Sequence, residues 1–71
     1  MVDVKAEIGG VVWKIEIATG IAVSEDDAIM ILESMKMEIP VLAPCGGTLA
    51  ECLVSEGETV REGQVIARIA T

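Results

Sequence analysis

Few side chains in this sequence could do chemistry by themselves. The chain has no histidine, which removes the commonest general base and the commonest metal ligand. Neither a serine–histidine triad nor a histidine zinc site can therefore form. The polar side chain that could do chemistry is Lys36. It lies between Met35 and Met37, with Glu33 and Glu38 close on either side. Its amine is suited to hold a passenger through an amide bond, so we expect a carrier or binding function and no catalytic residue.

The two cysteines, Cys45 and Cys52, are the only other nucleophiles of note, and they lie seven residues apart. A catalytic thiolate needs a basic partner, and no histidine is available for that role. We predict two small, partly buried free thiols, as expected in a reducing compartment. A disulfide or a redox pair is the alternative.

The overall charge excludes several classes of partner. The chain of 71 residues has 5 Lys and Arg against 12 Asp and Glu, which gives a formal net charge of −7. No basic patch is present, which argues against nucleic acid and against anionic membranes. The longest apolar run, residues 28–32, is too short to span a bilayer, and the first residues do not have the pattern of a signal peptide. We therefore expect a cytoplasmic location.

The two halves of the chain resemble each other at an offset of 37 residues. When residues 6–32 are placed on residues 43–69, seven of 27 positions match, whereas roughly two are expected by chance. The matching pairs are Ala6 with Ala43, Gly9 with Gly46, Gly10 with Gly47, Gly20 with Gly57, Val23 with Val60, Glu25 with Glu62, and Ile29 with Ile66. The repeat therefore includes turn residues as well as apolar ones.

Each half is predicted to be a short β meander. Valine, isoleucine and threonine make 22 of the 71 residues, a bias that favours strands. Turn signals recur at short spacing, which is typical of an all-β sandwich or flattened barrel, and two similar halves indicate pseudo-two-fold symmetry. We expect one domain over residues 1–71. The glycines expected to form turns are Gly10, Gly20, Gly47, Gly57 and Gly63.

One segment also fits a helix. Ser24 to Asp27 resembles a capping box, and the apolar residues that follow keep helical spacing through Met35. Its repeat partner, residues 61–69, has a glycine in the would-be first turn and alternates like a strand. Because both halves should share one fold, we predict strands in both.

Five further side chains have simple expectations. Trp13, the sole aromatic residue, is predicted to be a partly buried plug on a strand, with partner contact as the alternative. Pro40 lacks an N–H group and should lie in an edge strand or at a position without a backbone hydrogen bond. Pro44 should shape the turn into the second half. Glu25 and Glu62 should be solvated turn residues.

The segment that joins the two halves should be a tight hairpin with Lys36 near its tip. A lysine in an exposed turn is the ordinary interpretation of such a position. The methionines on both sides of Lys36 favour a functional interpretation of this position. Two exposed methionines do not help solubility, and methionine is suited to surfaces that bind partner proteins.

The segment Glu33-Ser34-Met35-Lys36-Met37 resembles the attachment motif of biotinyl domains, the biotin carboxyl carriers of biotin-dependent carboxylases. The usual motif is Ala-Met-Lys-Met, so Ser34 departs from the commoner alanine. The resemblance covers about residues 4–70. The other segments that agree in order and spacing are Ala43-Pro44, Gly47, Val54 to Val60 and Gly63 to Ile66.

This resemblance implies a fold of two four-stranded antiparallel sheets with pseudo-two-fold symmetry, the biotinyl/lipoyl-domain fold. It implies covalent biotin on Lys36, added by a biotin protein ligase with ATP. Met35 and Met37 would flank the cofactor, and Ser34, Glu33 and Glu38 would complete the segment that the ligase and other partners recognise.

The implied function is transport, with no catalysis by the chain itself. Biotin on Lys36 would take up a carboxyl group at a biotin carboxylase site and release it at a carboxyltransferase site. A lipoyl-type acyl carrier and an unmodified interaction module of the same fold are the alternatives. Lipoyl domains often have Asp before the lysine and Ala after it, so the two methionines favour biotin.

Overall fold

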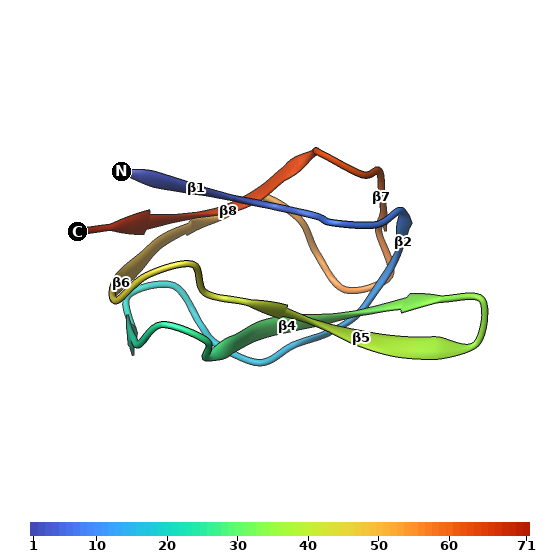
Figure 1. Ribbon diagram of the computed structural model, residues 1–71, viewed down its shortest axis with the longest axis horizontal. Helices are drawn as coiled ribbons and strands as arrows, with labels where there is room; N and C mark the ends of the chain where they lie inside the picture. The colour runs from blue at the N-terminus through green and yellow to red at the C-terminus, as the bar shows by residue number, and fades with distance from the viewer.

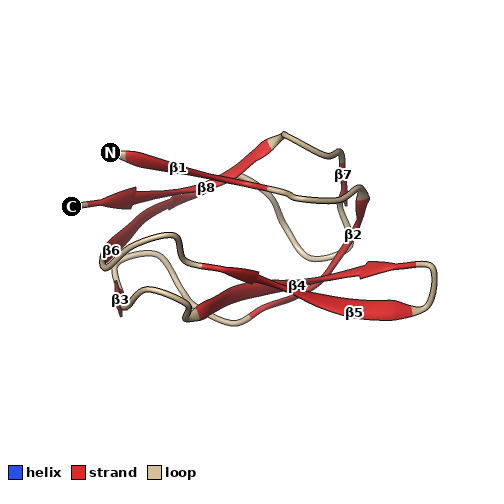
Figure 2. Cartoon of the chain, in the orientation of Figure 1, coloured by secondary structure: helices blue, strands red, loops and turns tan.

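The computed structural model describes all 71 residues, and every regular element in it is a β-strand. The eight strands are β1 (Val2–Lys5), β2 (Gly10–Ile15), β3 (Ala22–Val23), β4 (Ala28–Ser34), β5 (Met37–Leu42), β6 (Gly47–Cys52), β7 (Thr59–Val60) and β8 (Val65–Ala70). They form two antiparallel sheets, which we name sheet A (order β1-β8-β6-β3) and sheet B (order β5-β4-β2-β7; Figures 1 and 2). The predicted all-β fold is confirmed. No helix is present, so none could cross a membrane.

The 37-residue repeat is visible in the strand boundaries and in the loops. Strands β2 and β6 begin and end 37 residues apart, and so do β3 and β7. The backbone N–H of Val12 donates to the Glu58 carbonyl at 2.8 Å, and at the equivalent place the N–H of Leu49 donates to Ile21 at 3.0 Å. Each half therefore binds a loop of the other half in the same way, as the predicted pseudo-two-fold symmetry requires.

Irregularities in the ladders repeat as well. The pairing of β4 with β5 skips Ile29, and the pairing of β8 with β1 skips Ile66, 37 residues later. A β-bulge of this kind sets two consecutive residues against one partner, so both side chains turn to the same face. Ile29 and Met30 are accordingly both buried, and so are Ile66 and Ala67.

The expectation for Trp13 is wrong, and the reason is another bulge. The pairing of β2 with β4 steps from Val12 opposite Leu32 to Lys14 opposite Ile31, which leaves Trp13 as the extra residue. Val12 takes the inward position and is fully buried, while Trp13 and Lys14 both turn outward. The tryptophan is 49% exposed and does not plug the core.

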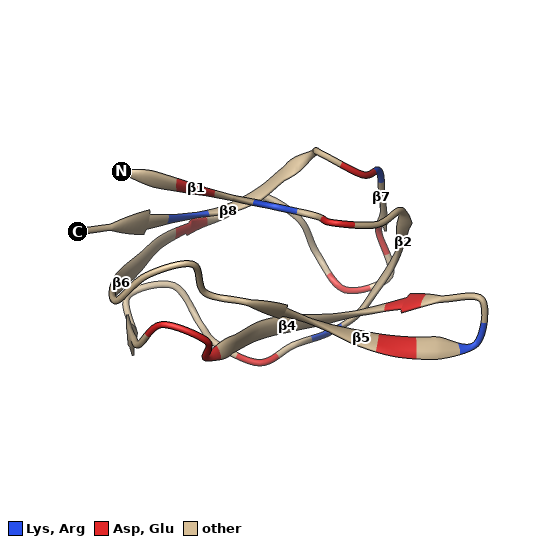
Figure 3. Cartoon of the chain, in the orientation of Figure 1, with Lys and Arg blue, Asp and Glu red and all other residues tan.

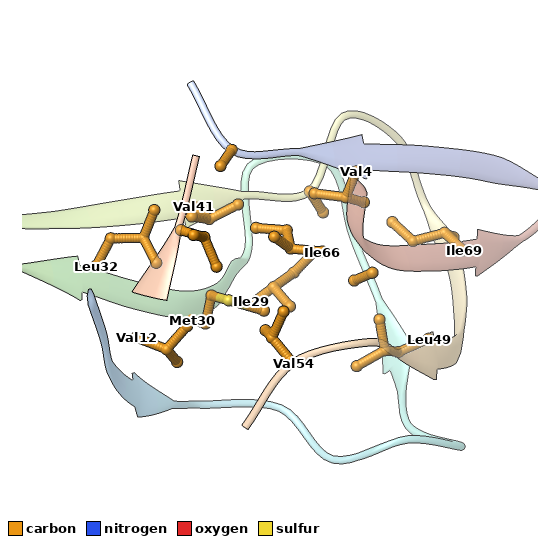
Figure 4. Close-up of a cluster of buried hydrophobic side chains, with 14 of the residues drawn as sticks. Val4, Val12, Ile29, Met30, Leu32, Val41, Leu49, Val54, Ile66 and Ile69 are labelled. Carbon is orange, nitrogen blue, oxygen red and sulfur yellow. The ribbon is translucent and has the colours of Figure 1, made fainter. Parts of the chain in front are cut away.

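The core lies between the two inner sheet faces and consists of aliphatic side chains and one methionine (Figure 4). No polar or charged side chain is buried in it. The fifteen buried residues are Val4, Ala6, Val12, Val23, Ile29, Met30, Leu32, Val41, Ala43, Leu49, Val54, Val60, Ile66, Ala67 and Ile69. Branched aliphatic side chains fill the narrow space between two packed sheets without an aromatic ring.

The segment that also fitted a helix is a turn followed by a strand. The Asp27 carboxylate accepts the N–H of Ser24 at 2.8 Å, which is half of the capping-box pattern. The chain then leaves the helical path, because Asp26 has a left-handed φ of 72° and donates its N–H to the Ala43 carbonyl at 2.9 Å. Gly63, the repeat equivalent of Asp26, has a φ of 85° and donates to Ala6 at 2.7 Å. The strand prediction is therefore confirmed.

The predicted turn glycines fall into two groups. Gly20, Gly57 and Gly63 have φ values of 94°, 90° and 85° and lie in turns, as predicted. Gly10 and Gly47 instead begin strands β2 and β6, so the turn prediction is wrong for them. A Cβ atom on Gly10 would lie 2.6 Å from the Glu33 carbonyl oxygen, so a close approach of two backbones requires glycine there.

The expectations for Pro40, for the two cysteines and for Glu25 and Glu62 are confirmed. Pro40 lies in β5, an edge strand of sheet B. Cys45 and Cys52 are free and half-buried, and the Cys52 thiol donates to the Val54 carbonyl at 3.3 Å. Glu25 and Glu62 are exposed turn residues.

The core packing predicts a large difference between two leucines that lie four residues apart. Leu49 is fully buried, whereas Leu53 is 42% exposed. Leu49→Ala should lower the free energy of unfolding by about 2–5 kcal/mol, because it leaves a cavity between the sheets. Leu53→Ala should cost less than about 1 kcal/mol. Urea unfolding followed by circular dichroism measures both, and equal losses would contradict this description of the core.

Candidate functional site

The site is built on the hairpin of β4 and β5. Its last cross-strand pair is Ser34 with Met37, so Met35 and Lys36 alone form the turn. Their φ values are 51° and 66°. Two positive φ values in a two-residue loop are the requirement of a type I′ turn, whose backbone twist matches that of the two strands. The turn therefore fixes the Lys36 backbone at the extreme end of sheet B.

This turn is strained for its residue types. Type I′ turns favour Asn-Gly, because side chains with a Cβ atom resist the left-handed region. The cost is about 1–2 kcal/mol for each residue. Neither Met35 nor Lys36 has a short polar side chain that could offset the cost by a local hydrogen bond. The turn persists because six cross-strand pairs between Ala28–Ser34 and Met37–Leu42 hold its stem.

The side chains at the tip are open to solvent. Met35 is 91% exposed and Met37 is 61% exposed, whereas Met30 in the same hairpin is fully buried. Lys36 is exposed, and the three ion pairs of the molecule do not include it. Its amine is therefore available to a reagent or an enzyme, with two flexible apolar side chains beside it.

The stem of the hairpin carries an unfavourable charge arrangement. Glu33 on β4 lies directly opposite Glu38 on β5, and both are exposed. Like charges at directly opposite positions destabilise a sheet. Neither carboxylate is ion-paired. Figure 3 shows the two acidic segments on the strands and the single basic segment at the turn. The stem thus presents a compact pair of negative charges behind the one positive charge.

The six residues singled out from the sequence, 33–38, are all in this hairpin, and the structure keeps them together as its tip and stem. The two cysteines lie on other elements and take no part in it. Trp13 was not expected here, yet its strand β2 is the direct neighbour of β4 in sheet B. The register shift between Val12 and Lys14, which the pairing of β2 with β4 shows, accompanies its outward orientation.

The left-handed turn predicts that glycine at its second position is stabilising. Lys36→Gly removes the steric cost of a Cβ atom at φ 66° and should raise the free energy of unfolding by about 1 kcal/mol. Lys14 is a matched control, since it is an exposed lysine inside β2. Lys14→Gly should lower the free energy by about 1 kcal/mol, because glycine weakens a strand. Thermal and urea unfolding measure both changes; a loss of stability in Lys36→Gly would contradict the turn geometry.

Comparison with known proteins places this geometry in a family. The family model described as "Biotin-requiring enzyme", which covers biotin and lipoyl domains, matches residues 1–69. The chain is 41% identical over 68 residues to the biotinylated protein TB7.3 homolog of Mycobacterium leprae, and the match covers 96% of each chain. It is 40% identical over 65 residues to the biotin carboxyl carrier protein of Streptococcus mutans, over 92% of this chain and 50% of that protein.

A solved structure agrees with these relatives. The urea carboxylase of Kluyveromyces lactis superposes with a TM-score of 0.92 at 32% identity, and the match covers 96% of this chain and 6% of that enzyme. The same fold thus occurs as nearly a whole protein and as a small part of a carboxylase. Because the family model spans residues 1–69 and a relative at 41% identity is matched along 96% of its length, the chain belongs to the biotin/lipoyl family of biotin-requiring enzymes.

Proposed function

We propose that this chain is a biotin carboxyl carrier that is acylated on Lys36. The observation that supports this most directly is the turn itself, in which an exposed, unpaired amine lies between two exposed methionines. Family membership makes biotin or lipoate the expected passenger. Relatives named as a biotinylated protein and a biotin carboxyl carrier protein favour biotin.

The residues present fit a covalently attached biotin. An amide bond between the Lys36 Nζ and the carboxyl group of biotin needs an amine that is exposed and not held by a carboxylate, and Lys36 meets both conditions. A biotin protein ligase would drive the condensation with ATP. When attached, biotin supplies a ring that can accept and release a carboxyl group.

The neighbouring side chains have distinct roles in this proposal. Met35 and Met37 provide polarizable apolar contacts on both sides of the amine, suited to surfaces that bind in turn to several enzymes. Ser34 pairs with Met37 and closes the turn. Glu33 and Glu38 present adjacent negative charges to the ligase and to other partners.

The chain itself supplies attachment and position, and the reactions belong to its partners. A biotin carboxylase would load the carboxyl group and a carboxyltransferase would remove it, so the tether raises the effective concentration of the carried group at both sites. We propose that residues 1–71 act as one carrier domain in the cytoplasm. The pair of Ser34 with Met37 closes the turn over two residues, which limits the loss of conformational freedom on docking.

Two other functions use the same fold. A lipoyl-type acyl carrier would hold lipoate on Lys36, and the family model includes such domains. An unmodified interaction module would leave the amine free and bind partners through the fold alone. The methionines on both sides of Lys36 favour biotin over either alternative.

Intact-mass measurement distinguishes the three functions. The chain should gain the mass of one biotin in amide linkage when it is incubated with a biotin protein ligase, biotin and ATP, and the product should bind streptavidin. Lys36→Arg should abolish the gain, because the guanidinium is not acylated. Lys14→Arg is the matched control and should gain the same mass as the unchanged chain, since it alters another exposed lysine of sheet B.

The other outcomes assign other functions. Lipoylation by a lipoate ligase without biotinylation would make the chain a lipoyl carrier. No adduct with either enzyme would leave an interaction module. A biotin adduct that persists in Lys36→Arg would place the attachment on another residue.

A further inference from the structure

The outer faces of the two sheets occupy equivalent positions but have different chemistry. On sheet A, Arg68 lies between Asp3 on β1 and Glu51 on β6, in register with both. Its guanidinium donates to Asp3 at 3.1 Å and to Glu51 at 3.2 Å. The hydrogen bond to Asp3 and the charge of Glu51 raise the pKa of Arg68 above its ordinary value. An ionic row thus crosses three strands of sheet A.

At the equivalent positions of sheet B the row is mostly apolar. Ile31 replaces the arginine, Pro40 replaces the aspartate and Lys14 replaces the glutamate, with the same cross-strand register. Trp13, beside Lys14, takes the place of Ala50. Trp13 is 49% exposed, and Pro40 is exposed as well. We call Trp13, Ile31, Pro40 and the neighbouring Val11 the outer patch.

The fold does not require this apolar chemistry. The ionic row occupies the equivalent backbone positions of sheet A, so an outer sheet face of this geometry is compatible with charged side chains. Val11, at 39% exposure, stands where Thr48 stands in sheet A. Adjacent exposed apolar side chains on one face are a sign of a protein contact. The within-molecule comparison therefore points to a binding surface on sheet B.

The charges around the outer patch limit what can cover it. Glu33 and Glu38 lie at its end nearest the hairpin, and the loop with Glu56 and Glu58 runs along β2. None of these four carboxylates is ion-paired. With a net charge of −7, a second copy, an anionic membrane and nucleic acid would all be repelled. The complementary occupant is a protein surface with an apolar centre and a basic rim.

The distance between the outer patch and the turn indicates which partner protein covers the patch. Ile31 on β4 is four residues from Met35 in the turn, which is about 13 Å at the usual strand rise. A standard protein interface covers about 800 Å² on each partner, about 30 Å across, so a protein docked on the turn also reaches the outer patch. The acylating enzyme must bring its active site into contact with the Lys36 amine, because the new bond forms there. Enzymes that use the finished arm can work at a greater distance.

We propose that the outer patch is part of the docking surface for the biotin protein ligase, an inference that rests on the proposed acylation of Lys36. The ligase seats an apolar centre on Trp13 and Ile31, with basic side chains toward Glu33 and Glu38. The outer patch contributes to binding, and the turn residues position the amine. Loss of the patch should therefore raise the KM for the carrier and leave kcat nearly unchanged.

The test exchanges the chemistry of the two outer faces. The variant Trp13→Ala with Ile31→Arg and Pro40→Asp places the sheet A residues at three of the equivalent positions of sheet B and keeps the net charge at −7. The matched control, Asp3→Ala with Arg68→Ala, alters the outer face of sheet A and also keeps the net charge. Steady-state biotinylation at saturating biotin and ATP should show at least a tenfold rise in KM for the first variant and less than a twofold change for the control.

A second measurement is independent of turnover and of the folding of the triple variant. Trp13 is the only tryptophan, so a ¹⁵N-labelled chain gives a single indole N–H resonance. In Lys36→Arg, which accepts no biotin, that resonance should shift or broaden when unlabelled ligase is added. Circular dichroism and thermal unfolding check that the face-exchange variant is folded.

The outcomes separate this proposal from the one on which it rests. A chain that ligase never biotinylates overturns both. A chain that is biotinylated with the same KM in both variants, and whose indole resonance ignores the ligase, overturns the docking surface and leaves acylation of Lys36 intact. Concentration-dependent dimerisation that the exchange variant loses would assign the outer patch to a second copy instead.

Discussion

The structure depends on the contact between two small sheets whose inner faces are filled mainly by valine, isoleucine and leucine side chains. Each sheet takes two strands from each half of the chain and buries its apolar face against the other sheet, so neither half forms this core alone. The loops strengthen this dependence, because the backbone of Val12 binds the loop at Glu58 and the backbone of Leu49 binds the loop at Ile21. Everything at the hairpin tip rests on that paired core.

The hairpin tip, residues 33–38, has several features that do not favour folding. Met35 and Lys36 take left-handed backbone conformations, and two carboxylates face each other directly behind them. The two methionines at the tip are largely exposed. Glycine in the turn, or a neutral side chain in place of one carboxylate, should remove the first two of these features with a gain in stability. These features occur together on the segment that carries the exposed Lys36 amine, which indicates a tip shaped by what must bind it.

Much of this arrangement could be predicted from the sequence because it is repeated. The 37-residue offset indicated equivalent strands in both halves, and it decided for a strand over a helix after Asp27. The position of Lys36 between two halves placed it in a connecting hairpin. Pro40 indicated an edge strand through its missing N–H group. These inferences succeeded because each rests on a local requirement of the backbone.

Other features depend on register, which composition does not reveal. The bulge at Trp13 reverses the face expected from simple alternation, and only the pairing with β4 shows it. Gly10 was expected in a turn, but it lies in a strand, and glycine is required there because its backbone lies close to that of Glu33. A Met-Lys pair carries no type I′ signal, so its left-handed backbone was not predictable. The outer patch emerged only from comparing two faces in three dimensions.

The pseudo-two-fold axis relates the hairpin to the place where the chain begins and ends, at the opposite pole of a molecule 33 Å long (Figure 1). Ile69 pairs with Val2 as Leu32 pairs with Ile39, so the gap between the termini is the geometric counterpart of the lysine turn. A short peptide closing that gap would give a circular polypeptide with two matching hairpins. Such a circular chain could be cut at another loop to give a circular permutant. With a lysine in the new hairpin, it would carry an exposed amine at each end of its long axis.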